Sequence, residues 1–349
     1  MTRPVAIAVA GYGLVGRRHV EAIARACGAA LAGVVEPGPA AADARAEGLP
    51  VWPDLDAAIA SGAAQAVILA TPNALHVDGA RACISAGLPA LVEKPLAIDA
   101  SAGAALVAEA EAAGVPLGVG HHRRHDPIVA AASQALRADA IGDVRAVQAT
   151  CWLAKPDAYF DAAPWRTRAG AGPGSVNLIH DLDLLRYLVG EVASVQAQAI
   201  PSRRGHAPED LLTALLRFDG GALGTVTVSD AIAAPWSWEL TAGENPAYPR
   251  TDQSAYLIGG TEGSLSLPDL RVWRHGDAPD WMTPIGATTL LRDRADALVA
   301  QVEDLARVVR TGDAPLVSGL EGLRTLRLLE AIQAAAAGGG TVAVSRDRP

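Results

Sequence analysis

The chain has 349 residues, which is longer than one typical domain and enough for two, each with its own apolar core. Half of the residues are hydrophobic and 19% are charged, as in ordinary packed globular proteins. The formal net charge of -9 argues against a nucleic-acid partner, because that class of protein needs a basic face.

No apolar run approaches the roughly 20 residues that a membrane helix requires, so we expect no membrane partner. The first apolar segment, residues 5–10, runs directly into a glycine turn, which indicates a strand and not a signal peptide. The three cysteines are Cys27, Cys83 and Cys151, far apart and without a C-x-x-C pair. This pattern argues against a disulfide framework or a structural zinc site and is typical of a cytoplasmic protein.

Short apolar runs alternate with helix-forming stretches over the first 120 residues. The runs are apolar throughout, as in parallel strands covered on both faces. We expect strands at 5–10, 31–35, 66–70, 90–92 and 117–119, and helices at 17–26, 40–47, 55–60, 76–86 and 101–113. This alternation predicts an α/β domain, a doubly wound parallel sheet of the Rossmann type, over residues 1–122.

After residue 122 the pattern changes to consecutive strands joined by short turns, such as Asp219-Gly220-Gly221. We expect strands at 144–153, 192–199, 210–218, 223–229, 238–241, 255–258 and 264–267, and helices at 127–138, 178–188, 295–309 and 320–337. Residues 123–349 are therefore predicted to form an α+β domain with an open, mainly antiparallel sheet, for substrate binding and oligomerisation. The last helix is free to pack back on the first domain.

A glycine-rich turn follows the first expected strand and opens a helix. The turn consists of Gly11, Tyr12, Gly13, Leu14, Val15 and Gly16. In this context Gly11 permits the tight turn, Gly13 lets the backbone approach a pyrophosphate, and Gly16 lets helix and strand pack closely. The amide groups at the helix start bind phosphates. The turn therefore predicts a dinucleotide site; the alternative is a glycine turn without a ligand.

Glu36 lies 20 residues past Gly16, at the end of the second expected strand. A carboxylate there accepts hydrogen bonds from the adenosine ribose and repels a 2′-phosphate. Residues 37–39 contain no arginine. Glu36 therefore favours NAD over NADP; the alternative is a solvated strand end.

Only Lys94 and Lys155 are lysines among the 29 basic side chains. Lys94 stands in Glu93-Lys94-Pro95, at the carboxyl end of the expected strand 90–92. That edge is where ligands bind in open α/β sheets.

With these motifs the chain resembles the Gfo/Idh/MocA oxidoreductases, named for glucose–fructose oxidoreductase and inositol dehydrogenase, over nearly its whole length. The motifs are the glycine turn 11–16, Thr71-Pro72-Asn73 with His76, Glu93-Lys94-Pro95, residues 120–127, Trp165-Arg166, the glycine-rich run leading to His180 and Asp183, and residues 260–265. The resemblance implies an NAD-dependent dehydrogenase or reductase acting on a secondary hydroxyl or ketone of a sugar, cyclitol or sugar acid. It also implies a homodimer or homotetramer.

In the first domain the resemblance places Lys94 beside the nicotinamide and the reacting carbon. A partly desolvated ammonium near a cationic ring has a lowered pKa and is suited to proton transfer or to holding a substrate oxygen. Further cofactor contacts are implied for Thr71, Pro72, Asn73, His76, Glu93 and His122, and structural or substrate support for Arg124. For His76 the alternative is a polar residue at a helix start.

In the second domain the resemblance makes His180 the general acid/base on the substrate hydroxyl, which suits an imidazole. Many relatives carry an aspartate where Val176 stands here. Asn177, one residue on, is able to hydrogen-bond to His180 or to the substrate. Asp183, one helical turn after His180, either orients it or has a structural role.

Further substrate contacts are expected from the loop before the glycine-rich run. Lys155, Trp165 and Arg166 supply a stacking surface and donors for a polyol or carboxylate, although Lys155 also fits a solvated loop charge. The adjacent histidines of residues 121–125 point in different directions and lack a spaced fourth ligand, so we expect no metal. Cys151 lies inside an expected strand and is interpreted as core.

Two other functions are compatible with the sequence. One is a dihydrodiol dehydrogenase acting on a ring diol, which some members of the family are. The other is a non-catalytic NAD-binding sensor on the same fold. Retention of Lys94 and His180 argues against the sensor, whereas the missing aspartate at 176 argues for it. The exact substrate, the direction of reaction and the number of subunits stay open.

Overall fold

The computed structural model describes residues 3–276 and 278–346. The chain forms two compact units. The first takes the chain up to Asp126 and again Ala295–Leu326; the second takes Pro127–Arg294 and the chain from Arg327 onward. The boundary expected after residue 122 thus lies at 126, and a C-terminal segment belongs to the first unit.

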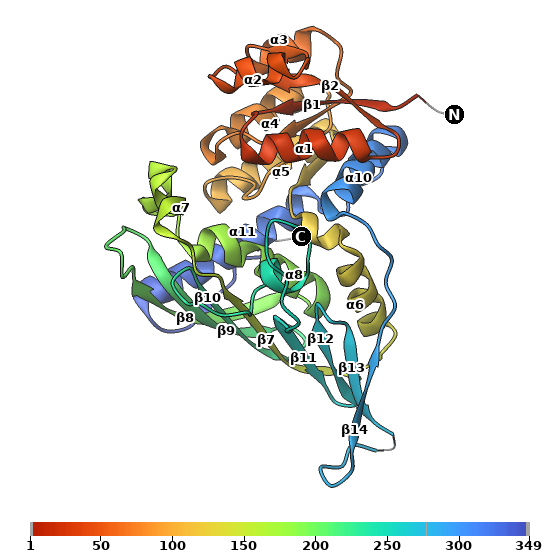
Figure 1. Cartoon of the computed structure of the whole chain (residues 1–349), viewed down its shortest axis with the longest axis vertical. Helices are drawn as coiled ribbons and strands as arrows, with labels where there is room; N and C mark the ends of the chain where they lie inside the picture. Colours follow the sequence, from red (N-terminus) through yellow and green to blue (C-terminus); the bar gives the residue numbers. More distant parts are fainter. Residues whose placement is uncertain (1–2, 277, 347–349) are drawn as a thin grey trace. The chain divides into compact units, whose positions relative to one another are not determined.

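The first unit contains a six-stranded, all-parallel sheet in the order β3-β2-β1-β4-β5-β6 (Figure 1). Its strands are β1 (Val5–Ala10), β2 (Ala29–Val35), β3 (Val51–Trp52), β4 (Ala66–Leu69), β5 (Ala90–Val92) and β6 (Leu117–Val119). The strand order reverses between β1 and β4, and in such sheets ligands bind outside the carboxyl ends of the strands at this point. The sequence missed β3, because two residues carry no periodic pattern.

Helices cover both faces of this sheet (Figure 1). They are α1 (Leu14–Arg25), α2 (Ala40–Ala46), α3 (Leu55–Ala60), α4 (His76–Ser85), α5 (Ala100–Ala113) and α10 (Ala297–Thr311). Alternate residues of β1 enter opposite cores: Ile7 packs with Ile23 of α1 and Val302 of α10, whereas Ala8 packs with Leu106 of α5. Helix α10 belongs to this unit because its apolar face completes the α1 side of the core.

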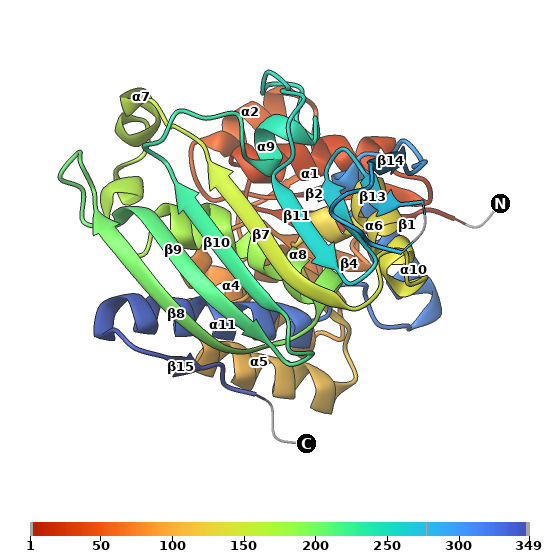
Figure 2. The ribbon, with the colours of Figure 1, turned by 90° about the horizontal axis from the view of Figure 1, so that it is seen from below.

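The second unit contains a nine-stranded sheet in the order β14-β13-β12-β11-β7-β10-β9-β8-β15 (Figure 2). Its strands are β7 (Val144–Trp152), β8 (Val192–Pro201), β9 (Glu209–Phe218), β10 (Leu223–Ser229), β11 (Tyr256–Gly260), β12 (Gly263–Leu267), β13 (Arg271–His275), β14 (Ile285–Thr289) and β15 (Val342–Ala343). All neighbouring pairs are antiparallel except β7 and β10. The predicted fold class is therefore confirmed for both parts of the chain.

One face of this sheet is covered by helices and the other is open. The helices of the unit are α6 (Pro127–Arg137), α7 (Asp157–Asp161), α8 (Ile179–Val189), α9 (Trp238–Thr241) and the part of α11 (Gly319–Gly338) from Arg327 on. Leu182 of α8 and Ile332 of α11 pack against strand residues such as Val226. Leu215, Leu223 and Leu257 on the strands are instead half exposed.

The prediction of a strand at 238–241 is wrong, because these residues form α9. The Ser237 side chain accepts a hydrogen bond from the Leu240 amide and so caps a helix. Trp238 is fully buried, donates to Glu244 at 2.9 Å and packs edge-on against Tyr256. The sequence also missed β13 and β14; β14 is exposed throughout and shows no alternation of burial.

Among the described residues, no helix is long and apolar enough to cross a membrane.

Candidate functional site

The glycine turn has the geometry expected for a phosphate cradle. Gly11 has a φ of +93°, and a Cβ there would lie 2.5 Å from the Ala70 carbonyl oxygen. A Cβ at Gly16 would lie 1.9 Å from the Gly11 carbonyl oxygen. A Cβ at Gly13, by contrast, would meet nothing within 4 Å. Gly11 and Gly16 are therefore required by close packing, while the space beside Gly13 is open to a ligand.

Helix α1 begins at Leu14 without a side-chain cap, because its N-cap residue is Gly13. The first peptide N–H groups of a helix lack intrahelical acceptors and favour an anion. Leu14 and Val15 are exposed at this helix start, 75% and 41%. The residues present therefore fit the pyrophosphate of a dinucleotide, held by backbone N–H groups.

The side chain of Tyr12 points into the unit and is 2% exposed. Its hydroxyl donates to Glu47 at 2.6 Å, and the Arg17 guanidinium lies 4.3 Å from its ring centre. Burial, together with the Glu47 carboxylate, raises the pKa of Tyr12. Tyr12 thus braces the turn against α2, and its backbone faces the cradle.

Glu36 is fixed beside the glycine turn by two backbone hydrogen bonds. Its Oε2 accepts from the Tyr12 amide and its Oε1 from the Gly38 amide, both at 2.8 Å. Each carboxylate oxygen retains a lone pair for a further donor, such as a ribose hydroxyl. Arg17 is paired with Asp43 and Glu47, at 2.7 and 2.9 Å, and so is engaged by carboxylates.

The loops after β4 and β5 are tied together by His76, which is fully buried at the start of α4. Its Nε2 lies 3.0 Å from the Thr71 carbonyl oxygen and its Nδ1 lies 2.8 Å from the Pro95 carbonyl oxygen. Pro72 and Asn73, which lie between Thr71 and His76 in the sequence, are exposed. The Thr71 hydroxyl is buried and has no hydrogen-bond partner among the described residues, which leaves it available to a ligand.

Glu93 is held by a histidine that the sequence did not single out. His19 of α1, fully buried, donates from Nε2 to Glu93 Oε1 at 2.7 Å, and the Lys94 amide donates to Glu93 Oε2 at 3.1 Å. Burial raises the pKa of Glu93, but the His19 hydrogen bond and the charges of His19, His122 and Lys94 outweigh it and lower the pKa to about 2. Glu93 is therefore ionised near neutral pH and anchors the backbone of Lys94.

The remaining first-unit candidates follow β5 and β6. Lys94 is half-buried directly after β5, and His122 is half-buried in the short 3-10 turn His122–His125 after β6. Arg124 is buried and paired with Glu321 at 2.9 Å, which supports the structural alternative for this residue. No cluster of three or more His, Cys, Asp or Glu in the described ranges could hold a metal ion.

In the second unit, Lys155 and Asn177 come together from distant parts of the chain. Lys155 Nζ donates to Asn177 Oδ1 at 2.7 Å, and Asn177 Nδ2 donates to Glu239 Oε1 at 3.3 Å. Lys155 is 9% exposed, so it is not a solvated loop charge. Burial lowers the pKa of its ammonium, partly offset by Asp230, Cys151 and Glu239.

Arg166 and Trp165 lie in the 3-10 turn Pro164–Thr167. The Arg166 guanidinium stacks 3.9 Å from the Tyr159 ring centre and donates from Nη1 to the Tyr159 carbonyl oxygen at 2.6 Å. Its Nε is buried without a hydrogen-bond partner in the described part of the chain. Trp165 is 51% exposed and available for stacking.

Asn177 lies in a π-helical turn, Gly174–Leu178, that runs directly into α8. Such turns occur often at functional sites. His180 is the second residue of α8 and is 8% exposed, and Asp183 is buried one turn later. The glycines before the turn have a packing reason, since a Cβ at Gly172 would lie 2.3 Å from the Glu209 carboxylate.

Sequence reasoning did not identify three residues that contact the candidate site residues or the turn before them: His19, Glu209 and Glu239. Glu239 is 62 residues from Asn177, and Glu209 is 35 residues from Gly174. No local spacing signals such contacts. His19 follows Gly16 by three positions on α1, so a buried polar residue on the inner face of that helix was the available clue.

Residues 5–121 match the family described as "Oxidoreductase family, NAD-binding Rossmann fold", and residues 129–266 match the "GFO/IDH/MocA C-terminal domain". The chain is 30% identical to D-apiose dehydrogenase of Paraburkholderia graminis, over 79% of this chain and 72% of that protein. It is 28% identical to inositol 2-dehydrogenase of Arthrobacter sp., over 82% and 83%.

Among solved structures, the WlbA dehydrogenase from Bordetella pertussis, in complex with NADH and UDP-GlcNAcA, is 27% identical. The TM-score is 0.81, and the match covers 99% of this chain and 100% of that one.

Proposed function

Because the chain belongs to the Gfo/Idh/MocA oxidoreductases, a family with an NAD-binding Rossmann domain, we propose that it interconverts a secondary hydroxyl and a ketone on a sugar- or cyclitol-like substrate. The chain is an oxidoreductase, and its relatives include dehydrogenases named for D-apiose and inositol. The observation that supports the substrate proposal is a polar cluster of the second unit. In it, buried Lys155 contacts half-buried Asn177, which lies three residues before buried His180 at the start of α8.

When bound, NAD supplies the hydride acceptor or donor at its nicotinamide. The residues of the chain bind and orient the cofactor and the substrate, and they accept or donate the proton. The glycine turn holds the pyrophosphate through backbone N–H groups, and Glu36 accepts from the ribose. His180 takes the hydroxyl proton at an imidazole nitrogen. The Lys94 ammonium is assigned the role of a donor to a substrate oxygen, where it stabilises developing negative charge. Asp183 supports the helix that carries His180.

We assign the remaining candidates by the same reasoning. Thr71, with its buried hydroxyl, contacts the nicotinamide side, and His76 holds the two loops on which Thr71 and Lys94 stand. Trp165 and Arg166 bind the far end of the substrate by stacking and by donation. The preference for NAD over NADP rests on Glu36, whose carboxylate is fixed beside the turn and repels a 2′-phosphate.

Neither alternative function gains support from the comparisons. The relatives reported above are named as dehydrogenases of a sugar and of inositol, which is the chemistry proposed here. The missing aspartate at position 176 is weak support for the sensor, because the neighbouring Asn177 hydrogen-bonds to both Lys155 and Glu239.

The test is formation of NADH, measured by its absorbance, over a panel of myo-inositol, D-apiose, a sugar acid and an arene dihydrodiol. We expect turnover with at least one of the first three. Tight binding of NADH without turnover of any compound would favour the sensor, and turnover of the dihydrodiol alone would favour the ring-diol enzyme. The matched control is the Lys94→Ala variant, which should bind NADH like the wild type and lose turnover.

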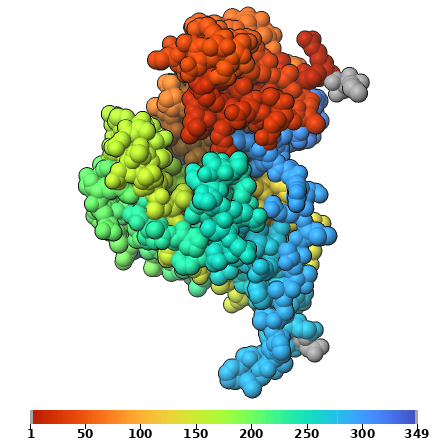
Figure 3. All heavy atoms as spheres, viewed as in Figure 1, coloured from red at the N-terminus to blue at the C-terminus, as the bar shows by residue number. Residues whose placement is uncertain are grey.

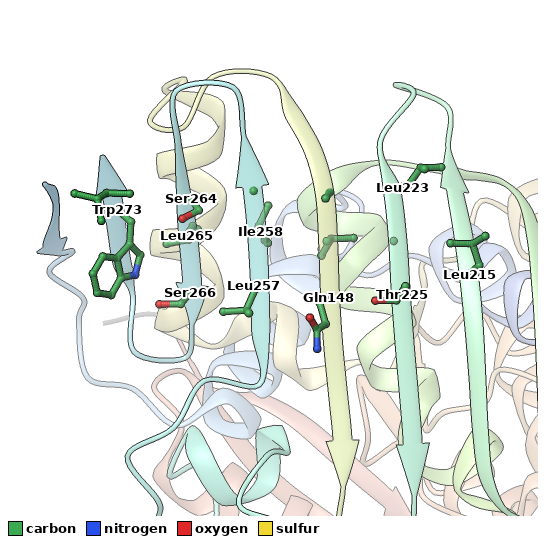
Figure 4. A pocket seen from close by; sticks show the side chains of 15 residues that line it. Gln148, Leu215, Leu223, Thr225, Leu257, Ile258, Ser264, Leu265, Ser266 and Trp273 are labelled. Carbon is green, nitrogen blue, oxygen red and sulfur yellow. The ribbon is translucent and has the colours of Figure 1, made fainter. Parts of the chain in front are cut away.

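We also propose that the open face of the nine-stranded sheet joins two copies of the chain. Leu215, Leu223, Thr225, Gln148 and Leu257 point to this face from neighbouring strands, where a shallow cavity of about 610 Å³ lies (Figure 4). None of the residues lining this cavity is charged. Because this lining carries no charge, it adds no like-charge repulsion between two copies of a chain whose net charge is -9.

An arm formed by β13, β14 and residues 278–284 projects from the second unit (Figure 3, light blue), and Trp273 and Ile285 of its strands line the same cavity. It carries Trp281 and Met282, exposed by 94% and 76%. Apolar side chains of this size on an arm are typical of residues buried in an assembly. A homodimer, or a homotetramer built from it, is therefore the proposed state. Light scattering on the purified chain tests it, and a monomer at micromolar concentration would refute it. The three cysteines form no disulfide within the described residues, which is compatible with the proposed cytoplasmic location.

A further inference from the structure

Glu239 has no role in the function proposed above, yet its carboxylate is part of the polar cluster at Lys155. It lies in α9, whose start is capped by Ser237. Its Oε1 accepts from Asn177 Nδ2 at 3.3 Å, and its Oε2 accepts from the Cys151 thiol at 3.8 Å. Helix α9 thus delivers a carboxylate to the far side of Asn177 from Lys155.

The chemistry of the three side chains leaves a single orientation for the Asn177 amide. An ammonium only donates hydrogen bonds, and an ionised carboxylate only accepts them. With Oδ1 toward Lys155 and Nδ2 toward Glu239, both contacts are favourable. A flipped amide would turn its NH₂ group toward the ammonium and its oxygen toward the carboxylate, and both contacts would be repulsive. The ammonium and the carboxylate therefore fix the orientation of the Asn177 amide.

The side chain of Lys155 is long and flexible, so a partner of fixed orientation restricts the position of its ammonium group. In the described part of the chain, Asn177 Oδ1 is the one hydrogen-bond acceptor of the Nζ group, and the Tyr159 ring centre lies 5.0 Å away on another side. Two N–H bonds of the ammonium therefore have no acceptor among the described residues. A buried ammonium with two such donors is suited to bind oxygen atoms of a ligand.

We propose that Glu239 is a positioning residue of the substrate site, which acts through Asn177 to hold the Lys155 ammonium where it donates to substrate oxygens. This inference rests on the proposed dehydrogenase function, because it deepens the role of the same site. The relay runs from the carboxylate of α9 through the amide of the π-helical turn to the ammonium after β7. Replacement of Glu239 weakens substrate binding without touching the cofactor cradle.

The lysine content of the chain allows a direct test. With two lysines, ¹³C labelling of lysine Cε gives two side-chain NMR signals, and the Lys155→Arg variant identifies the one from Lys155. The charged and titratable groups that face this ammonium are Asp230, Cys151, Glu239, Arg166 and Tyr159. Burial already lowers the pKa of Lys155, and Glu239 opposes that shift. The Glu239→Gln variant is therefore expected to move the Lys155 titration to lower pH.

The matched control is Glu262→Gln, the same chemical change at a half-exposed carboxylate of the second unit that pairs with Arg274. It should leave the Lys155 titration and all kinetics at the wild-type values. If the Lys155 titration in Glu239→Gln coincides with that of the wild type, Glu239 is not coupled to the ammonium and the proposal is overturned.

The kinetic arm separates a relay from a purely structural role. Glu239→Gln should raise KM for the substrate on the order of tenfold, as for the loss of a hydrogen bond to a charged group, with little change in NADH affinity. In an Asn177→Leu background the same replacement should have no further effect on KM, because the relay is already broken. Equal effects of Glu239→Gln in both backgrounds would overturn the relay. Failure of the wild type to turn over any sugar or cyclitol would instead refute the proposed function. That result comes from the substrate panel on the wild type and not from the comparison of variants.

Discussion

A methyl group at position 13 or at position 16 of the glycine turn should separate cofactor binding from folding. In Gly13→Ala the new Cβ meets nothing within 4 Å, and the backbone φ of -76° is ordinary for alanine. Because alanine loses less conformational entropy than glycine on folding, the free energy of unfolding should rise by about 0.4–1 kcal/mol. The methyl group nevertheless occupies the space through which a pyrophosphate approaches the backbone.

Gly16→Ala is the matched change on the same turn. Its Cβ would lie 1.9 Å from the Gly11 carbonyl oxygen, well inside any real contact distance, so helix α1 must move away from the turn. Overpacking of this kind costs about 1–3 kcal/mol of unfolding free energy. Displacement of the helix start also misdirects its N–H groups, so this variant should lose both stability and NADH affinity.

The assays are urea unfolding and NADH fluorescence titration on the wild type and both variants. We expect Gly13→Ala to be at least as stable as the wild type and to bind NADH more weakly by about 1.4 kcal/mol or more, which is tenfold in Kd. Gly13→Ala with wild-type affinity would refute the reasoning, since the open side of the turn would then not face the cofactor. Gly16→Ala with wild-type stability would refute the packing role of that glycine.

Three further predictions follow from single contacts. Glu36→Ala should improve the binding of NADP relative to NAD on the order of tenfold, measured as the ratio of Kd values, because the carboxylate near the 2′-position is removed. The pKa of Glu93 is about 2 in the folded chain against an ordinary value of 4.5, so Glu93 contributes about 3 kcal/mol to the free energy of unfolding. This contribution is fully present above pH 4.5 and is lost as the pH falls toward 2, so the Glu93→Gln variant should show a flatter dependence of stability on pH in this range. Leu257→Glu places a charge on the open sheet face and should lower the mass measured by light scattering, with unchanged melting temperature because the side chain is half exposed within the chain.

Elements with a clear hydrophobic pattern over several residues could be predicted from the sequence. Strands β1, β5 and β6 were expected with the bounds that the structure shows, because buried parallel strands are short apolar runs between helices. Where the pattern is weak, prediction failed. The two residues of β3 are too few to show a pattern. In residues 238–241, Trp238, Leu240 and Thr241 have side chains that also fit a strand, but the Ser237 cap begins a helix there.

The site could be predicted where a motif is local and missed where it is not. The glycine turn, Glu36 and Lys94 follow from their positions at strand ends. The partners that hold them do not, since His19 lies 74 residues from Glu93 and Glu36 reaches back 24 residues to the Tyr12 amide. Whether Lys155 is a solvated charge or a buried donor also depends on tertiary contacts. Residues 159, 177 and 230, which are distant in sequence or carry no local signal, surround its side chain in the fold.

The departure at position 176 acquires a physical meaning from these contacts. The resemblance leads one to expect an aspartate there, and Val176 supplies no carboxylate. In this chain Asn177 supplies a neutral amide instead, and the negative charge enters one step further away, from Glu239. A neutral amide next to Lys155 accepts one hydrogen bond and leaves the other N–H groups of the ammonium for the substrate. An adjacent aspartate would form a direct ion pair and would compete with the substrate for these N–H groups. The Asn177→Asp variant should therefore raise the pKa of Lys155 and weaken substrate binding at the same time, and a variant with wild-type KM would show that the amide is not needed for this purpose.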